Sequence, residues 1–268
     1  MCLIAIGFRA SARYPLIVAA NRDESHARPS AAAAWWPDRP PILAGRDLEA
    51  GGTWLGVDRG GRLAAVTNLR DASGAAAARA TPAPAASAPP DRAKGQKRAP
   101  RSRGLLVASF LADTRGVDGS LAALEAEAHL YRPFNLLLYD GAELGYASNR
   151  APSRSLGYGV HAFSNTLPGD PWPKIARARD GVLQVLEEPE PMEALFALLA
   201  EGAREPRVSD ADMRRSALFQ LDAAWGTRCS TVVLVDAGGR VRFRERRFDA
   251  AGRPAGESGY EFGIEPRR

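Results

Sequence analysis

The sequence predicts an α+β fold built from antiparallel sheets, and three observations support this class. Short apolar segments typical of strands occur in neighbouring pairs joined by brief turns. Segments with helical periodicity also occur in pairs. The chain does not alternate strand and helix in the way that predicts a parallel sheet, and it has no glycine-rich phosphate loop between a strand and a helix.

In the N-terminal part, two pairs of strands are expected. The pairs are residues 3–8 with 16–20, and 53–57 with 63–67. The segment RASARYP connects the first pair, and DRGG forms a hairpin turn in the second.

The C-terminal part combines paired helices with further strands. Apolar periodicity predicts helices over 104–112, 120–129, 172–186, 191–201 and 209–221, and strands over 134–139, 144–147, 160–164, 231–236 and 240–248. The apolar stripe of residues 191–201 is typical of a core-facing helix.

The segment from residue 71 to residue 103 differs from the rest in composition. It is rich in Ala, Pro and Ser, and it holds seven basic residues against two acidic ones, which accounts for the net charge of +5. Such a segment buries too little apolar surface to offset its ordering entropy, so we expect a disordered insertion in one domain that spans 1–268. The remainder is nearly neutral, and nucleic-acid binding is not expected.

Composition also bears on the compartment. No stretch approaches the roughly 18 apolar residues that a membrane span needs, and MCLIAIGFRA lacks the features of a secretory signal. The two cysteines, Cys2 and Cys229, form no disulfide framework, which favours a reducing, cytoplasmic location.

Cys2 is the first candidate for chemistry. Removal of Met1 would leave a thiol and a free amine on the same residue. An α-amine titrates near pH ~8 and a thiol near pH ~8.5, so the amine can act as the base for its own thiol. The alternative is an incidental cysteine at the start of a buried strand.

A block of polar residues, Asn21 to Glu24, directly follows the strand expected over 16–20. If this strand pairs antiparallel with residues 3–8, the block lies beside Cys2. A carboxylate there can hold the amine, and Arg22 can pair with it or bind an acidic substrate group. The alternative is an ordinary turn rich in Asn and Asp.

Five motifs together carry a family resemblance. They are MC, AANRDESHARPS, LAGRDLEAGGTWLGVDRGGRLAAVTNLR, FSNTLPGDPWPK and WGTRCSTVVLVD, and they occur in this order from Met1 to about Asp236. The chain resembles the NRDE family, also called the Transport and Golgi organisation family. The basic insertion is not part of the resemblance.

The resemblance implies an αββα sandwich of the N-terminal nucleophile type. The family is similar to cysteine amidases such as penicillin V acylase, bile salt hydrolase and acid ceramidase, in which an N-terminal Cys attacks an amide carbonyl. Matched by motif, Cys2 is the nucleophile, Asp23 orients the amine, Asn68 and Asn165 stabilise the oxyanion, and Arg228 supports the nucleophile. Residues of the NRDE block, Asn21, Arg22, Glu24, His26 and Arg28, are expected to bind substrate.

The resemblance also leaves a non-catalytic alternative, because members have been linked to haem trafficking and to acyl-lipid handling. In a haem carrier, His26, Cys2 or Cys229 could be an axial ligand, and Arg22 and Arg28 could bind the propionates. Trp35 to Pro37 could line an apolar pocket, contact a membrane surface or belong to the core.

The amidase reaction requires no cofactor. A metal site is not expected, since CxxC and HExxH motifs are missing. The expected partner is a small amide, haem or an acyl lipid, and the sequence leaves the oligomeric state open.

Overall fold

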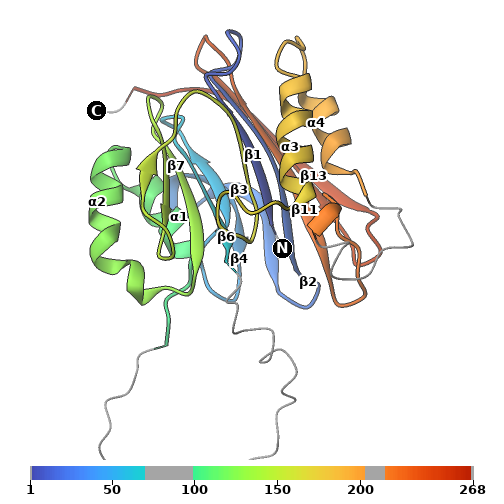
Figure 1. Ribbon diagram of the computed structural model, residues 1–268, viewed down its shortest axis with the longest axis horizontal. Helices are drawn as coiled ribbons and strands as arrows, with labels where there is room; N and C mark the ends of the chain where they lie inside the picture. Colours follow the sequence, from blue (N-terminus) through green and yellow to red (C-terminus); the bar gives the residue numbers. More distant parts are fainter. Residues whose placement is uncertain (1, 70–98, 203–214, 267–268) are drawn as a thin grey trace, which may run out of the picture.

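The computed structural model describes residues 2–69, 99–202 and 215–266. Two antiparallel sheets pack face to face, with one pair of helices on each outer side (Figure 1). This arrangement confirms the predicted α+β sandwich.

One sheet has six strands in the order β10-β1-β2-β11-β12-β13, and every neighbouring pair is antiparallel. Its strands are β1 (Leu3–Phe8), β2 (Leu16–Ser25), β10 (Gly159–Phe163), β11 (Trp225–Val235), β12 (Arg240–Phe248) and β13 (Pro254–Gly263). The chain's first strand, β1, therefore has a partner on each side.

The other sheet has seven strands, ordered as they follow along the chain. They are β3 (Ser30–Trp36), β4 (Arg39–Asp47), β5 (Leu55–Asp58), β6 (Leu63–Asn68), β7 (Phe134–Tyr139), β8 (Leu144–Ser148) and β9 (Arg154–Ser155).

Helices cover the outer face of each sheet. The helices are α1 (Gly104–Ala112), α2 (Val117–Glu127) with the short η2 (Ala128–Leu130), α3 (Pro173–Gln184) and α4 (Met192–Leu199). The first two pack on the seven-stranded sheet, whereas α3 and α4 pack on β1, β2, β10 and β11. Within the described ranges, no helix has both the length and the apolar character needed to cross a membrane.

Alternation along the central strands decides which side chains face the inter-sheet space. On β1, Ile4 belongs to the apolar layer between the sheets, whereas Leu3 packs under α3 and α4. On β2, Ala20 and Ala19 divide in the same way. Successive strand residues point to opposite faces, so the same alternation gives the direction of the side chains further along β1 and β2.

The polar NRDE block differs from the expectation. Strand β2 continues through it to Ser25 instead of ending at residue 20. Asn21 pairs with Leu3 on one side and with Ser230 on the other. The backbone of the block is therefore part of the sheet and does not form a turn. Hydrogen bonds from distant partners let these polar side chains remain in a buried strand.

Four strands, β3, β4, β9 and β13, were not predicted. Trp36 on β3 is a core residue with 3% of its surface exposed, and its indole N–H donates to the backbone oxygen of Ala44 at 3.1 Å. Trp35 is half-buried against Tyr260 and Phe262 of β13. Both tryptophans therefore join packed layers.

Two predicted segments fall partly outside the described residues. Residues 71–98 of the predicted insertion and residues 209–214 of the last predicted helix are among those not described. Residues 217–221, expected to end that helix, are not helical. Residues 99–103, assigned to the insertion, are described, and Arg101 forms a bridge with Tyr131.

Candidate functional site

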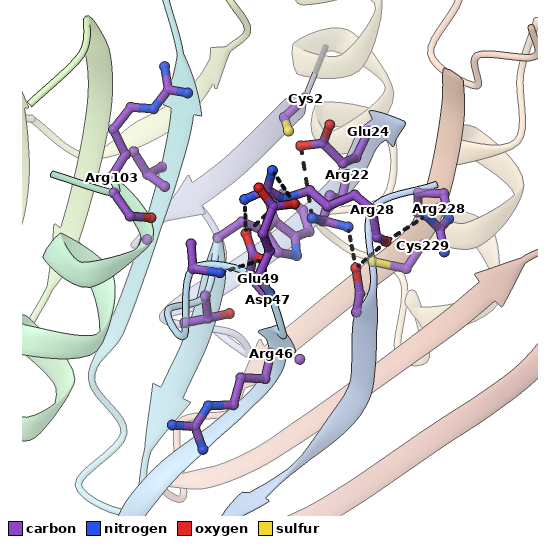
Figure 2. Close-up of a pocket in the computed structure, with 18 of the residues that line it drawn as sticks. Cys2, Arg22, Glu24, Arg28, Arg46, Asp47, Glu49, Arg103, Arg228 and Cys229 are labelled. Carbon is purple, nitrogen blue, oxygen red and sulfur yellow. Dashed lines mark hydrogen bonds and ion pairs between the residues drawn. The ribbon is translucent and has the colours of Figure 1, made fainter. Parts of the chain in front are cut away.

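A cavity of about 500 Å³ opens between the sheets, at the end where Cys2 precedes the first strand, β1. Its walls come from the ends of β2, β3, β4, β6, β11 and β12, together with residues 100–104 ahead of α1. Figure 2 shows the side chains that line it.

Cys2 supplies a thiol to this cavity. The residue is 7% exposed, and its Sγ lies 4.0 Å from the backbone oxygen of Asp23. The hydroxyl of Ser164 donates to the backbone oxygen of Cys2 at 2.8 Å, which anchors the start of β1. Burial raises the pKa of the Cys2 thiol, so it is protonated at neutral pH and needs a base to become a nucleophile.

A second thiol lines the same cavity. Cys229 of β11 pairs with Arg22 of β2, and Leu3 pairs with Asn21, so the Arg22 position separates the two cysteines. Burial, followed by the charge of Glu245, raises the pKa of Cys229 well above its ordinary value. Two buried thiols thus line one cavity, and Cys229 serves as an internal comparison for Cys2.

Two residues of the NRDE block point away from the cavity. Asn21 donates from Nδ2 to the backbone oxygens of Leu199 and Leu218, at 2.8 and 2.9 Å, and its Oδ1 accepts from Ser230 at 2.6 Å. Its amide is thus engaged with α4 and the segment that leads into β11. Asn21 does not line the cavity.

Asp23 lies on the same face of β2 as Asn21. Its Oδ1 accepts a hydrogen bond from the hydroxyl of Thr227 at 2.7 Å, and the residue is 4% exposed. Burial raises the pKa of this carboxyl, and the positive charge of the buried Lys174 on α3 opposes the rise. The carboxyl therefore lies behind the sheet, while its backbone contacts the Cys2 thiol.

Asn68 and Asn165 are linked to each other. Asn165 donates from Nδ2 to the backbone oxygen of Asn68 at 2.6 Å. Asn68 closes β6 and lines the cavity, whereas Asn165 is 4% exposed and lies behind it. Its Oδ1 has no hydrogen-bond partner among the described residues.

Arg228 lies at a bulge in β11. Its Nη1 donates to the backbone oxygens of Ser25, His26 and Arg28, at 2.8, 3.2 and 3.2 Å. Arg228 lines the cavity, and these bonds make it the residue that fixes the loop after β2.

The remaining predicted residues divide between the cavity and its surroundings. Arg22 donates to the Ser30 hydroxyl at 3.1 Å and lies 3.9 Å from Glu24. Arg28 pairs with Asp47 at 2.8 Å. His26 does not line the cavity, and its Nε2 lies 3.0 Å from the backbone oxygen of Asp222. Six predicted residues therefore line the cavity (Cys2, Arg22, Glu24, Arg28, Asn68 and Arg228), and four do not (Asn21, Asp23, His26 and Asn165).

Sequence reasoning missed most of the basic wall. Arg103 and Arg132 line the cavity, as do Glu245 and Arg247 of β12. Arg103 was assigned to the insertion because of its neighbours' composition. The alternating RVRFRERRF of β12 is a strand signal that could have placed its charged residues on a common face. Among the described residues, no cluster of His, Cys, Asp and Glu could hold a metal ion.

A thiol at the head of a central strand, in a four-layer sandwich, defines an N-terminal nucleophile hydrolase-like fold. Comparison with a solved structure agrees. The *Caenorhabditis elegans* N-acylethanolamine-hydrolyzing acid amidase ortholog superposes with a TM-score of 0.51, covering 87% of this chain and 92% of that one. At 10% sequence identity this likeness bears on the fold alone.

The chain belongs to the Transport and Golgi organisation 2 family, whose model matches residues 1–250. The *Bos taurus* Transport and Golgi organization protein 2 homolog is 35% identical, and the *Homo sapiens* homolog is 32% identical. Each alignment covers 92% of this chain and 92% of the relative. The family resemblance seen in the motifs is thus confirmed.

Proposed function

We propose that this protein hydrolyses a linear amide with Cys2 as the nucleophile, after Met1 has been removed. The observation that carries the proposal is that Cys2 lines the cavity. A hydrogen bond from the Ser164 hydroxyl to the Cys2 backbone oxygen fixes its position at the start of β1. The fold adds support by analogy, since the similar *C. elegans* protein is an amidase.

The proposed reaction begins with proton transfer from the Cys2 thiol to the α-amine of the same residue. The thiolate attacks the amide carbonyl carbon, and the carbonyl oxygen becomes an oxyanion. Collapse of this intermediate breaks the C–N bond, and the leaving nitrogen takes the proton from the α-amine. Water then hydrolyses the thioester, which releases a carboxylic acid and regenerates the thiol.

Asn68 is the proposed oxyanion donor, because this residue lines the cavity. One such amide donor typically lowers the barrier by about 3 kcal/mol. Asn165 has a positioning role in this scheme, since it holds the backbone of Asn68 at the end of β6. Asp23 is buried on β2 next to Cys2, and its carboxylate is the proposed counter-charge for the α-amine.

Carriage of haem or an acyl lipid is the competing function. The cavity lining is mostly charged and polar, and His26 lies outside it, which favours a small polar amide over either ligand. We also propose a cytoplasmic location, because the two cysteines are free thiols and disulfides are rare in reducing compartments.

Two cysteines in one cavity make a matched test. Intact mass should show that Met1 is absent, and an electrophilic amide analogue should modify wild type once. Cys2→Ala should abolish modification and turnover of an amide panel, whereas Cys229→Ala should retain both. Retention of Met1, or labelling that survives Cys2→Ala, would contradict the proposal. A Soret shift on adding haem, with no turnover of any amide, would favour the carrier.

A further inference from the structure

The cavity wall carries an excess of positive charge. Eight arginines line it, against four acidic side chains. Four of the arginines have carboxylate partners within 4.0 Å: Arg22, Arg28, Arg46 and Arg101. Within the described part of the chain, no such partner accompanies Arg103, Arg132, Arg228 or Arg247. Arg228 is already engaged with three backbone oxygens, which leaves its guanidinium committed to the loop.

Arg103 and Arg132 are brought together by two adjacent segments. The backbone N–H of Arg101 donates to the oxygen of Leu130 at 2.9 Å, so residues 101–103 lie beside residues 130–133. Nη1 of Arg103 donates to the backbone oxygen of Pro133 at 3.1 Å. The Arg103 side chain is therefore held in place next to Arg132.

The two guanidinium groups repel each other at this position. Burial, and next the positive charge of Arg132, lower the pKa of Arg103 from its ordinary value. Like charges held together without a counter-ion are unfavourable, most of all where water is partly excluded. The first turn of the adjoining α1 contains no acidic side chain to compensate them. An anion from solution would relieve this repulsion.

Arg103 lies across the cavity from Cys2 (Figure 2). Glu24, on the same side as Cys2, is occupied by the Arg22 guanidinium and by the backbone N–H of Ser25. A ligand that reaches Cys2 from the open cavity thus has, at its other end, two cations with no carboxylate of the described residues within 4.0 Å. The cavity volume of about 500 Å³ accommodates a small ligand of this kind.

We propose that the substrate carries an acidic group, a carboxylate or a phosphate, which Arg103 and Arg132 bind while the scissile amide lies at Cys2. Guanidinium groups bind both anions through paired N–H donors, so the shared chemistry is an oxyanion of fixed geometry. The inference rests on the proposed amidase function and adds the class of substrate. It also explains why an amidase cavity is basic.

Two alkylating reagents of similar size test the proposal. The Cys2 sulfur displaces iodide from either iodoacetate, which is anionic, or iodoacetamide, which is neutral. The rate with iodoacetate is divided by the rate with iodoacetamide, first at Cys2 and then for free cysteine. The first ratio divided by the second isolates the effect of charge. Any change in the thiolate fraction cancels, because it affects both reagents equally. We expect a normalised ratio of about 10 or more in wild type, in line with electrostatic steering into charged clefts.

Variants assign the effect to the arginine pair. Arg103→Gln/Arg132→Gln should bring the normalised ratio to within about 2-fold of one, and Arg103→Lys should retain most of it. If the double variant folds poorly, the normalised ratio of the single variant Arg132→Gln, at an exposed residue, tests the same proposal. Arg46→Gln is the matched control, since Arg46 lines the cavity but is paired with Asp38 at 2.7 Å. An unchanged ratio in both Arg132→Gln and the double variant would overturn the proposal.

A second measurement does not depend on the reactivity of Cys2. Inorganic phosphate and acetate are titrated against the melting temperature of wild type and of Cys2→Ala, and the more effective anion identifies the acidic group. We expect stabilisation in both proteins and none in Arg103→Gln/Arg132→Gln. An equal stabilisation of the double variant would overturn the anion site. If Cys2 fails to react but stabilisation depends on the arginines, the amidase proposal fails and the anion site stands.

Discussion

At the scale of single residues, Glu245 is the most unusual carboxyl group in the wall between the sheets. It is 3% exposed, and it accepts a hydrogen bond from the backbone N–H of Ala33 at 2.9 Å. Burial raises its pKa above the ordinary value of 4.5, against the opposing effect of that hydrogen bond. The folded protein therefore holds the Glu245 proton at pH values where the unfolded chain has released it.

The pH dependence of stability follows from this difference. Above pH 4.5 the folded state binds more protons at Glu245 than the unfolded state, so the contribution of this group to the free energy of unfolding falls as pH rises. The fall ends once the raised pKa of the folded state is passed. Glu245→Gln should remove this part of the slope and gain stability over wild type between about pH 5 and pH 8.

Urea unfolding at a series of pH values measures this effect. Glu125→Gln is the control and should follow the wild-type slope, because this exposed carboxyl group on α2 has no ion pair among the described residues. A Glu245→Gln protein that follows the wild-type curve throughout would show that the carboxyl ionises normally in the folded state.

The residue scale also shows the limits of prediction. The antiparallel pairing of the first two strands correctly brought the NRDE block to Cys2, because two short apolar segments with a brief connection form a hairpin. The direction of each side chain did not follow, because the strand was expected to end at residue 20. The partners that keep it in the strand, such as Leu199, Leu218 and Thr227, are remote in sequence. Nothing in a local pattern identifies them.

At the scale of elements, the segment before α1 is fixed by a close approach of two glycines. A Cβ on Gly52 would lie 2.5 Å from the backbone carbon of Gly104, the first residue of α1. The backbone N–H of Thr53 donates to the Gly104 oxygen at 3.2 Å. This contact holds the start of α1, and with it Arg103, against the cavity wall.

Gly52→Ala should therefore destabilise the protein by about 1–3 kcal/mol, because backbone atoms cannot yield as a flexible side chain can. Gly157→Ala is the matched control, since a Cβ there meets no atom within 4 Å. Chemical denaturation measures both. Equal stability of the two variants would mean that α1 shifts at little cost.

Several elements with a clear apolar pattern in the sequence were predicted with the correct bounds. Residues 3–8, 104–112, 134–139 and 240–248 match the observed β1, α1, β7 and β12. The missed strand β13 reads PAGESGYEFG and is largely exposed, so it lacks the apolar alternation on which strand prediction depends. Strand β13 forms because its backbone pairs with the edge of β12 and because Tyr260 and Phe262 pack against Trp35.

At the scale of the whole molecule, the layers hold the start of β1, next to the proposed nucleophile Cys2, at a highly constrained point. Strand β1 has β10 and β2 as neighbours, and helices on one side and the second sheet on the other cover it (Figure 1). A chain terminus is ordinarily a mobile part of a protein. Here the first residues are held on both edges and both faces, which is the condition that a terminal nucleophile requires.

Amide hydrogen exchange should reveal this gradient. Strands β1, β2 and β11 lie inside the six-stranded sheet and are buried on both faces, so their amides should open only in global unfolding. Strand β13 lies at the edge of the same sheet and is mostly exposed, so its outward amides should exchange through local opening, many-fold faster. Comparable protection of β13 and β2 would contradict the layered account. Fast exchange at Leu3 and Ile4 would go further, because a loosely held first strand could not keep the Cys2 thiol in the cavity.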